Sequence, residues 1–121
     1  MIEQVILENL LHNDDYARRV LPFLKDEYFA ESSYSIVFAK IREFLTKYNK
    51  TPTQEELLIE IKNTRGLSQK NYEDAIDLIK ILSKRNKAPS TDWLIEQTEK
   101  FCKDKALFNA IVEAAAMIED E

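Results

Sequence analysis

The sequence predicts an all-helical protein, with a compact head of five helices over residues 1–90 and a long protruding C-terminal helix over 91–121, together one structural domain. Three observations predict this class. Gly66 is the only glycine among 121 residues and there are three prolines, whereas sheets joined by tight hairpins usually need several residues that tolerate positive φ. Apolar residues recur at spacings of three and four. From Thr91 onward there is no glycine or proline.

The first quarter of the chain predicts two short helices and a loop. Residues 2–12 place apolar side chains on one helical face. Asp14 is a suitable N-cap for a second helix over 15–21, which Pro22 ends. A compact segment then follows, and we expect four of its side chains to fill the core from a loop: Phe23, Leu24, Tyr28 and Phe29.

The strongest periodicity in the sequence lies in residues 33–48, which predict the central helix of the core. Ser32 or Ser33 is the expected N-cap. Polar residues occupy the opposite side, and the apolar positions form a nearly unbroken stripe: Tyr34, Val37, Phe38, Ile41, Phe44, Leu45 and Tyr48.

Two more helices complete the predicted head. Thr53 followed three residues later by Glu56 is a capping box that starts a helix over 54–63. Gly66 is expected to adopt the left-handed conformation where that helix breaks off. Ser68 then caps a helix that reaches about Ser83.

The last helix is predicted over residues 92–119. A helix of about 28 residues is about 42 Å long, whereas a globule of this size is about 35 Å across, so the helix should protrude. Trp93, Leu94 and Phe101 can dock on the head, but the apolar residues of 110–118 have nothing left in the chain to cover them. We expect these to pack against another subunit, or against a helix of a longer parent chain from which this fragment is cut.

Composition excludes several kinds of chemistry. A P-loop needs two glycines and a dinucleotide fingerprint two or three, so one glycine permits neither. The only histidine, His12, is expected to stabilise the C-terminal end of its helix, and no metal site or catalytic dyad can be built around it. The only cysteine, Cys102, can form no internal disulfide, which fits a reducing cytoplasm, and we expect it to pack on an apolar helix face. We therefore predict no catalytic, cofactor or metal residues.

Charge and hydropathy exclude further classes of partner. The net charge is −5, which gives no overall attraction to nucleic acid. The N-terminus lacks the features of a signal peptide, and no apolar run approaches the roughly 20 residues that cross a bilayer. The charge is uneven, with seven basic and three acidic residues in 62–87 against three and eight in 92–121. A solvated surface explains this pattern, but one basic stretch is also a candidate for polar contact with an acidic arm or partner: Lys80, Lys84, Arg85 and Lys87.

Residues 51–80 also fit a helix-turn-helix, with a Gly-containing turn between two capped helices. In a DNA-binding regulator of this kind, Ser68, Gln69 and Asn71 would face the bases. The same helix continues with Glu73 and Asp74, and carboxylates near the phosphates oppose the electrostatic part of binding. This reading is an alternative to an interaction domain.

The order and spacing of these elements resemble the N-terminal domain of DnaB-like hexameric replicative helicases. That family has E-x-x-V-L-x-x-L-L, then L-x-x-x-x-F, then a long helix with I-F-x-x-I-x-x-L. Residues 2–29 and 34–61 supply the matching stretches, IEQVILENLLHNDDYARRVLPFLKDEYF and YSIVFAKIREFLTKYNKTPTQEELLIEI. In the final run, Lys105, Leu107 and Ile111 fit the R/K-A-L-x-x-x-I pattern in the first arm of the family's helical hairpin.

Two departures separate this chain from the cellular members of that family. Tyr34 stands where those proteins often have histidine, and Thr51-Pro52-Thr53 stands where they favour D-x-x-T-L. The proline-containing entry, the EYF stretch and the DWL start of the last helix look more like the primase-helicases of T-even-type phages.

The resemblance implies a non-catalytic collar domain. In that family the arms pair within a trimer of dimers on the hexamer, and primase or a helicase loader docks on the collar. A separate motor domain holds ATP and Mg²⁺, and DNA is bound through the full-length hexamer. The implied location is the bacterial cytoplasm, with a phage gene as one source, and a free-standing helical adaptor or loader-like factor remains a further alternative. The arm residues expected at subunit contacts are Phe108, Ile111, Val112, Ala115 and Ile118.

Overall fold

The computed structural model describes residues 1–84 and 87–119. Within them the chain is helical and contains no strand, which confirms the predicted fold class. The elements are α1 (Ile2–His12), α2 (Asp14–Val20), the 3₁₀ turns η1 (Leu21–Phe23) and η2 (Asp26–Tyr28), α3 (Ser32–Tyr48), α4 (Gln54–Lys62), α5 (Gln69–Leu82) and α6 (Thr91–Glu119).

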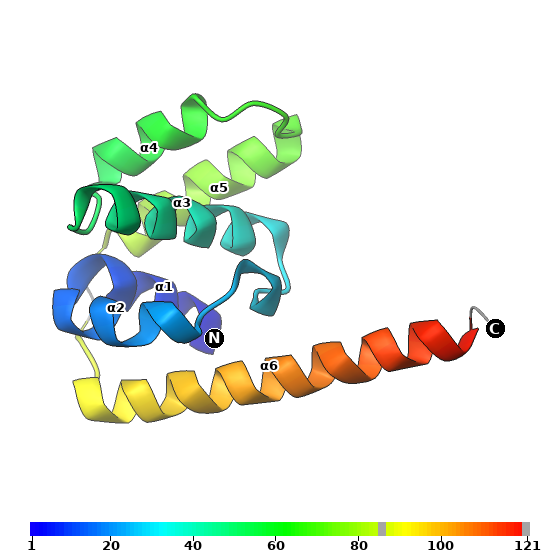
Figure 1. The fold of residues 1–121 in the computed structure, drawn as a ribbon. Coiled ribbons are helices and arrows are strands. Elements are labelled where there is room, and N and C mark those ends of the chain that lie inside the picture. Colours follow the sequence, from blue (N-terminus) through cyan, green and yellow to red (C-terminus); the bar gives the residue numbers. More distant parts are fainter. Residues whose placement is uncertain (85–86, 120–121) are drawn as a thin grey trace.

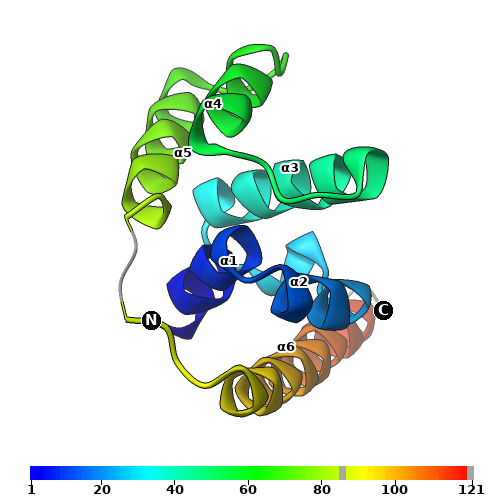
Figure 2. The ribbon, with the colours of Figure 1, turned by 90° about the vertical axis from the view of Figure 1, so that its left-hand side faces the viewer.

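Helix α3 lies at the centre of the arrangement. Figure 1 shows α4 and α5 on one side of it and α1 and α2 on the other, with α6 running past α1 and α2 and projecting beyond them. The view turned by 90° places α6 below α1 and α2, far from α4 and α5 (Figure 2). The described contacts agree, since α3 packs on α1, α4, α5 and η2, while α6 packs on α1, α2 and η2.

One hydrophobic core joins all of these helices. Phe29, which follows η2, stacks on Phe38 of α3 with ring centroids 5.0 Å apart. The same ring contacts Phe101 of α6 with a centroid separation of 5.7 Å. The side chain of one loop residue therefore connects the central helix to the last one, as the predicted loop plug requires.

The plug prediction is right for three of its four residues. Leu24, Tyr28 and Phe29 are buried, but Phe23 is 51% exposed. The 3₁₀ turn of η1 explains this, because it directs Leu24 inward and leaves Phe23 at the surface. In α3, Tyr48 is also half exposed, since it lies in the last turn of the helix, beyond the main core.

Helix caps account for the start of α4 and α5 as predicted. The Thr53 hydroxyl accepts a hydrogen bond from Glu56 N at 3.1 Å, and the Glu56 carboxylate accepts one from Thr53 N at 3.0 Å, which completes the capping box. The Ser68 hydroxyl accepts from Asn71 N at 3.1 Å. Gly66 has φ +86°, the left-handed conformation that glycine adopts without strain.

Two predicted caps are wrong. Helix α2 begins one residue earlier than expected, so its N-cap is Asn13, whose side chain accepts from Tyr16 N at 3.1 Å, and not Asp14. Neither Ser32 nor Ser33 caps α3, because the helix already includes both, and Glu31 holds the N-cap position without a side-chain bond.

The N-terminal half of α6 is attached to α2 by a buried hydrogen bond. Tyr16 Oη lies 2.6 Å from Thr98 Oγ1, and both residues are fully buried. Because the Thr98 hydroxyl donates its hydrogen to Leu94 O at 2.7 Å, Tyr16 must be the donor in the bond between them. Burial raises the pKa of the Tyr16 phenol, so Tyr16 keeps its proton throughout the physiological range.

We predict that Tyr16→Phe lowers the free energy of unfolding by about 1–2 kcal/mol, because it removes the donor of a buried bond and leaves the Thr98 oxygen with one partner fewer. Urea denaturation followed by circular dichroism measures this. Thr98→Val should cost a similar amount, and the double variant less than the sum. Tyr72→Phe is the control, on half-buried α5 surface, and a loss as large there would contradict the assignment.

Candidate subunit interface on helix α6

Burial along α6 changes abruptly near its middle. Leu94, Ile95, Thr98, Phe101 and Cys102 are buried against the other helices. From residue 106 to 119 every side chain is exposed except that of Asn109, which is half-buried. Six large apolar side chains in this segment are each more than half exposed: Leu107, Phe108, Ile111, Val112, Met117 and Ile118.

Most of these exposed side chains share one side of the helix. Phe108, Ile111, Ala115 and Ile118 are spaced by three, four and three residues, the spacing of a coiled-coil seam. Leu107 and Val112 flank that line. We refer to these six residues as the apolar face of α6. At 3.6 residues per turn, it is rotated by about 120° from the side of α6 that packs on the head.

The five predicted subunit-contact residues all lie on this face. These five side chains therefore lie together and are exposed, as a contact surface requires. Leu107 was not among the predicted contacts, and its spacing from Ile111 was the signal that could have included it. Trp93, expected to dock on the head, is half exposed, because its neighbours Leu94 and Ile95 occupy the buried side of the first turn.

The only cysteine and the only histidine of the chain both make structural contacts within the protein. Cys102 is buried, and desolvation raises its pKa to about 11, so the thiol is protonated near neutral pH and packs in the core. His12 Nε2 lies 2.8 Å from Leu82 O. That bond ties the end of α1 to the last turn of α5, so His12 does more than complement its own helix end, and the sequence could not reveal a partner 70 residues away.

The basic stretch lies away from the apolar face. Lys80 is exposed on α5, which both ribbon views place on the far side of α3 from α6. Lys84 and Lys87 are also exposed, whereas Arg85 lies outside the described residues. Lys87 lines a surface groove of about 410 Å³ with Met1, Val5 and Trp93 among its walls.

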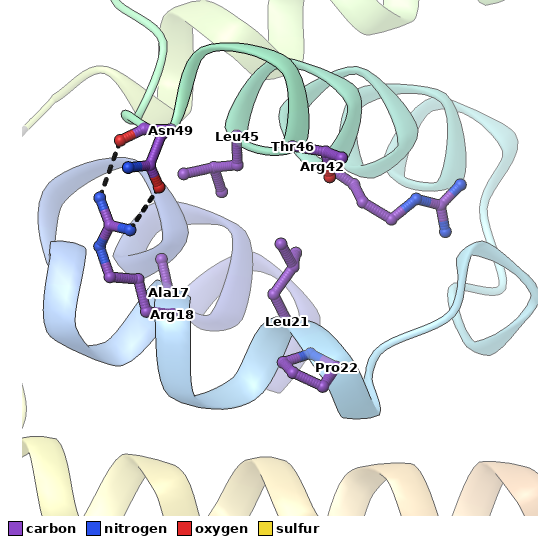
Figure 3. Close-up of a pocket in the computed structure, with 8 residues that line it drawn as sticks. All are labelled: Ala17, Arg18, Leu21, Pro22, Arg42, Leu45, Thr46 and Asn49. Atoms are coloured by element: carbon purple, nitrogen blue, oxygen red, sulfur yellow. Dashed lines mark hydrogen bonds between the residues drawn. The ribbon is translucent and has the colours of Figure 1, made fainter.

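A second groove, which the sequence gave no reason to expect, lies between α2, η1 and the C-terminal half of α3 (Figure 3). Its volume is about 480 Å³, and its lining includes Leu21, Pro22 and Leu45. At one end, Arg18 donates to Asn49 Oδ1 at 2.7 Å and to Asn49 O at 2.8 Å. Asn49 can receive both bonds because it ends α3 in the left-handed conformation, with φ 56°.

Both arginines that line this groove, Arg18 and Arg42, form ion pairs with carboxylates of the same chain. Arg18 also forms an ion pair with Asp14 at 2.8 Å. Arg42 pairs with Asp26 at 2.9 Å, and that hydrogen bond lowers the pKa of the Asp26 carboxyl. The groove therefore offers an apolar floor with neutralised ends, and it lacks the free cations that would attract an anionic ligand.

The helix that a helix-turn-helix protein would insert into DNA, α5, carries three acidic side chains against two lysines. At the start of α5, Gln69 donates to Glu73 at 2.9 Å and Lys70 pairs with Asp74 at 3.0 Å. The expected base-reading residue Gln69 is thus occupied, and the nearby lysine is neutralised by a carboxylate. These contacts disfavour the regulator alternative.

We predict that the protein does not retard duplex DNA in an electrophoretic mobility assay at low salt, where phosphate contacts are strongest. A salt-sensitive shift that Lys70→Glu abolishes would restore the regulator alternative.

Among the described residues, no group of three or more His, Cys, Asp and Glu side chains is placed to hold a metal ion. None of the helices in the described ranges combines the length and apolar character of a membrane span.

Comparison with known proteins relates the sequence to a phage helicase. No model of a known protein family matches the sequence. A curated protein of Enterobacteria phage T4, described as a DnaB-like replicative helicase, is 27% identical over 107 residues, which are 88% of this chain and 22% of the phage protein. This similarity confirms the resemblance found in the sequence. The chain spans about a fifth of the length of that relative, the size of one domain.

Proposed function

We propose that this chain is the N-terminal collar domain of a hexameric replicative DNA helicase, a non-catalytic domain that joins subunits and docks primase or a helicase loader. The observation that carries the proposal is the apolar face of α6. Similarity to a domain-sized part of a phage DnaB-like helicase supports the replication context. The proposed division is a head over residues 1–90 and an arm over 91–121.

The energetics of the apolar face support an interaction role. Covering a large apolar side chain contributes about 1.5–3 kcal/mol, and Leu107, Phe108, Ile111, Val112 and Ile118 are all more than half exposed. Association costs several kcal/mol in lost translational and rotational freedom, so covering these side chains in both members of a pair yields a net gain. Contiguous apolar surface of this kind on a water-exposed helix marks a contact site.

The proposal assigns the helicase chemistry to a different part of the parent protein. ATP and Mg²⁺ bind in a motor domain, and DNA is held by the complete hexamer in the bacterial cytoplasm. Exposed Lys80, Lys84 and Lys87 are proposed to make polar contacts with an acidic arm or partner. Lys80, on α5, lies on the opposite side of α3 from α6 and stays accessible when the apolar face is covered.

Sequencing the source gene beyond codon 121 tests the helicase assignment. We expect an open reading frame that continues into a second hairpin helix and a G-x-x-x-x-G-K-[ST] motif. A stop codon at that point would contradict the assignment and favour the free-standing adaptor.

For the interface itself, we predict that Ile111→Asp weakens self-association by at least about tenfold, because it places a carboxylate in the middle of an apolar contact. Sedimentation equilibrium over a range of protein concentrations measures the dissociation constant. Ala110→Asp is the matched control, since it adds the same charge at an exposed position one residue away that is not part of the apolar face. A wild-type chain that stays monomeric at high concentration with α6 folded, or equal effects of both variants, would contradict the interface.

A further inference from the structure

The surface groove between α1 and the start of α6 combines apolar walls with an exposed cation. Its volume is about 410 Å³, and one of its sides follows residues 2–9 of α1. Val5, Pro89 and Trp93 contribute apolar surface to it. Lys87, which also lines the groove, is exposed. A ligand in this groove would therefore meet apolar surface and a positive charge side by side.

We infer that this groove binds a short acidic segment of a partner protein, an extended peptide in which large apolar side chains are flanked by carboxylates. The inference gives the acidic partner proposed for Lys84 and Lys87 a definite site, and it rests on the proposed function only for the existence of that partner. It follows from three features of the described residues: an exposed indole ring, two lysines without ion pairs, and the length of the groove.

Trp93 supplies the main apolar contact. It is the only tryptophan of the chain, and it is half exposed although its neighbours Leu94 and Ile95 are buried. Its ring thus belongs to the surface of the groove and not to the core. Tryptophan is the residue type most enriched among those that dominate the binding energy of protein interfaces, because it offers a large apolar area with few rotatable bonds. An apolar side chain placed against it would remove that area from water.

Two lysines supply the charge. Lys87 lines the groove. Lys84 lies near the end of the groove at Glu8, because His12 of α1 is bonded to Leu82 O at 2.8 Å and two residues of chain span at most about 7 Å. Among the described residues, neither lysine forms an ion pair, whereas Glu8 already interacts within the chain. The carboxylates of a ligand would therefore be attracted to this part of the surface.

The groove between α2 and α3 is less suited to an acidic ligand, although it is larger. Arg18 pairs with Asp14 at 2.8 Å, and Arg42 pairs with Asp26 at 2.9 Å. A carboxylate that entered that groove would have to break one of these pairs. No such pair has to be broken at the lysines beside α1, as far as the described residues extend. The difference in available charge selects the groove beside α1.

The length of the groove sets the length of the ligand. Residues 2 and 9 of α1 are separated along the helix axis by about 10.5 Å. An extended chain covers this distance with about three residues. A core of two or three residues can therefore place an apolar side chain against Trp93, while the acidic residues that flank this core reach toward the lysines.

The fluorescence of Trp93 measures binding directly, because the chain has no other tryptophan. The probe is an octapeptide with two leucines between triplets of aspartate, DDDLLDDD. We expect a saturable blue shift of the emission that weakens as salt is added, with a dissociation constant at least about tenfold lower than for DDDSSDDD or KKKLLKKK. No saturable shift, or equal binding of either control peptide, would overturn the inference.

Substitutions locate the binding site. Lys87→Glu should raise the dissociation constant of DDDLLDDD by about three- to tenfold at low salt. Lys62→Glu is the matched control, since it reverses the charge of an exposed lysine at the end of α4, and it should have no effect. Trp93→Ala should weaken binding at least about tenfold, measured by the fluorescence anisotropy of a labelled peptide. With folding checked by circular dichroism, equal effects of the two lysine variants, or normal binding by Trp93→Ala, would overturn the inference.

A second copy of the chain is the competing occupant of this groove. A blue shift of the Trp93 emission when the chain is concentrated without peptide would assign the groove to that copy and overturn the inference. The proposed interface fails separately, because sedimentation of the wild type and of Ile111→Asp tests the apolar face, whereas the peptide titration tests the groove. A monomeric chain that binds DDDLLDDD would remove the interface and leave the groove.

Discussion

The attachment of α6 by its first half alone is the constraint on which the rest of the molecule depends. Phe101 meets Phe29 in the core, and Thr98 receives the buried hydrogen bond of Tyr16. Both contacts lie before residue 103, and the helix continues to Glu119. Since a helix of 29 residues is longer than the packed helices beside it, the head can cover only its beginning. The apolar residues beyond must face solvent or a partner.

The head is built to hold that attachment in a fixed direction. Helix α2 supplies Tyr16, and it is itself held to the end of α3 by Arg18, which binds Asn49 twice. Phe29 stacks on Phe38 of α3, and His12 joins the ends of α1 and α5. These contacts connect distant parts of the sequence, so the direction of α6 depends on the whole head rather than on the loop that precedes it.

Composition leaves the apolar surface of α6 as the candidate functional feature of this chain. A chain with one glycine cannot build a phosphate-binding loop, and its single cysteine and single histidine are both engaged in structural contacts. The C-terminal half of α6 instead exposes several large apolar side chains to solvent. The chain is also similar to a domain-sized part of a phage DnaB-like helicase.

Local patterns allowed much of this protein to be predicted from its sequence. The helices, the capping box of Thr53 and Glu56, the left-handed Gly66 and the exposed apolar residues of α6 all depend on residues within one or two turns of one another, so their signals are contiguous in the chain. The N-caps of α2 and α3 were misplaced because neighbouring polar residues compete for one position, and only the start of the helix decides between them. Phe23 was misplaced because hydrophobicity alone does not show which way a 3₁₀ turn directs its side chains.

Only the tertiary structure decided which residues meet across long separations. The bonds of Tyr16 to Thr98, His12 to Leu82 and Arg18 to Asn49 join residues 82, 70 and 31 positions apart, and no periodicity encodes such pairs. The groove between α2 and α3 arises from the same packing. The sequence by itself determined that part of α6 must be exposed, because its length exceeds the size of the head. The structure determined which side of α6 the head covers, because that depends on how α1, α2 and η2 pack together.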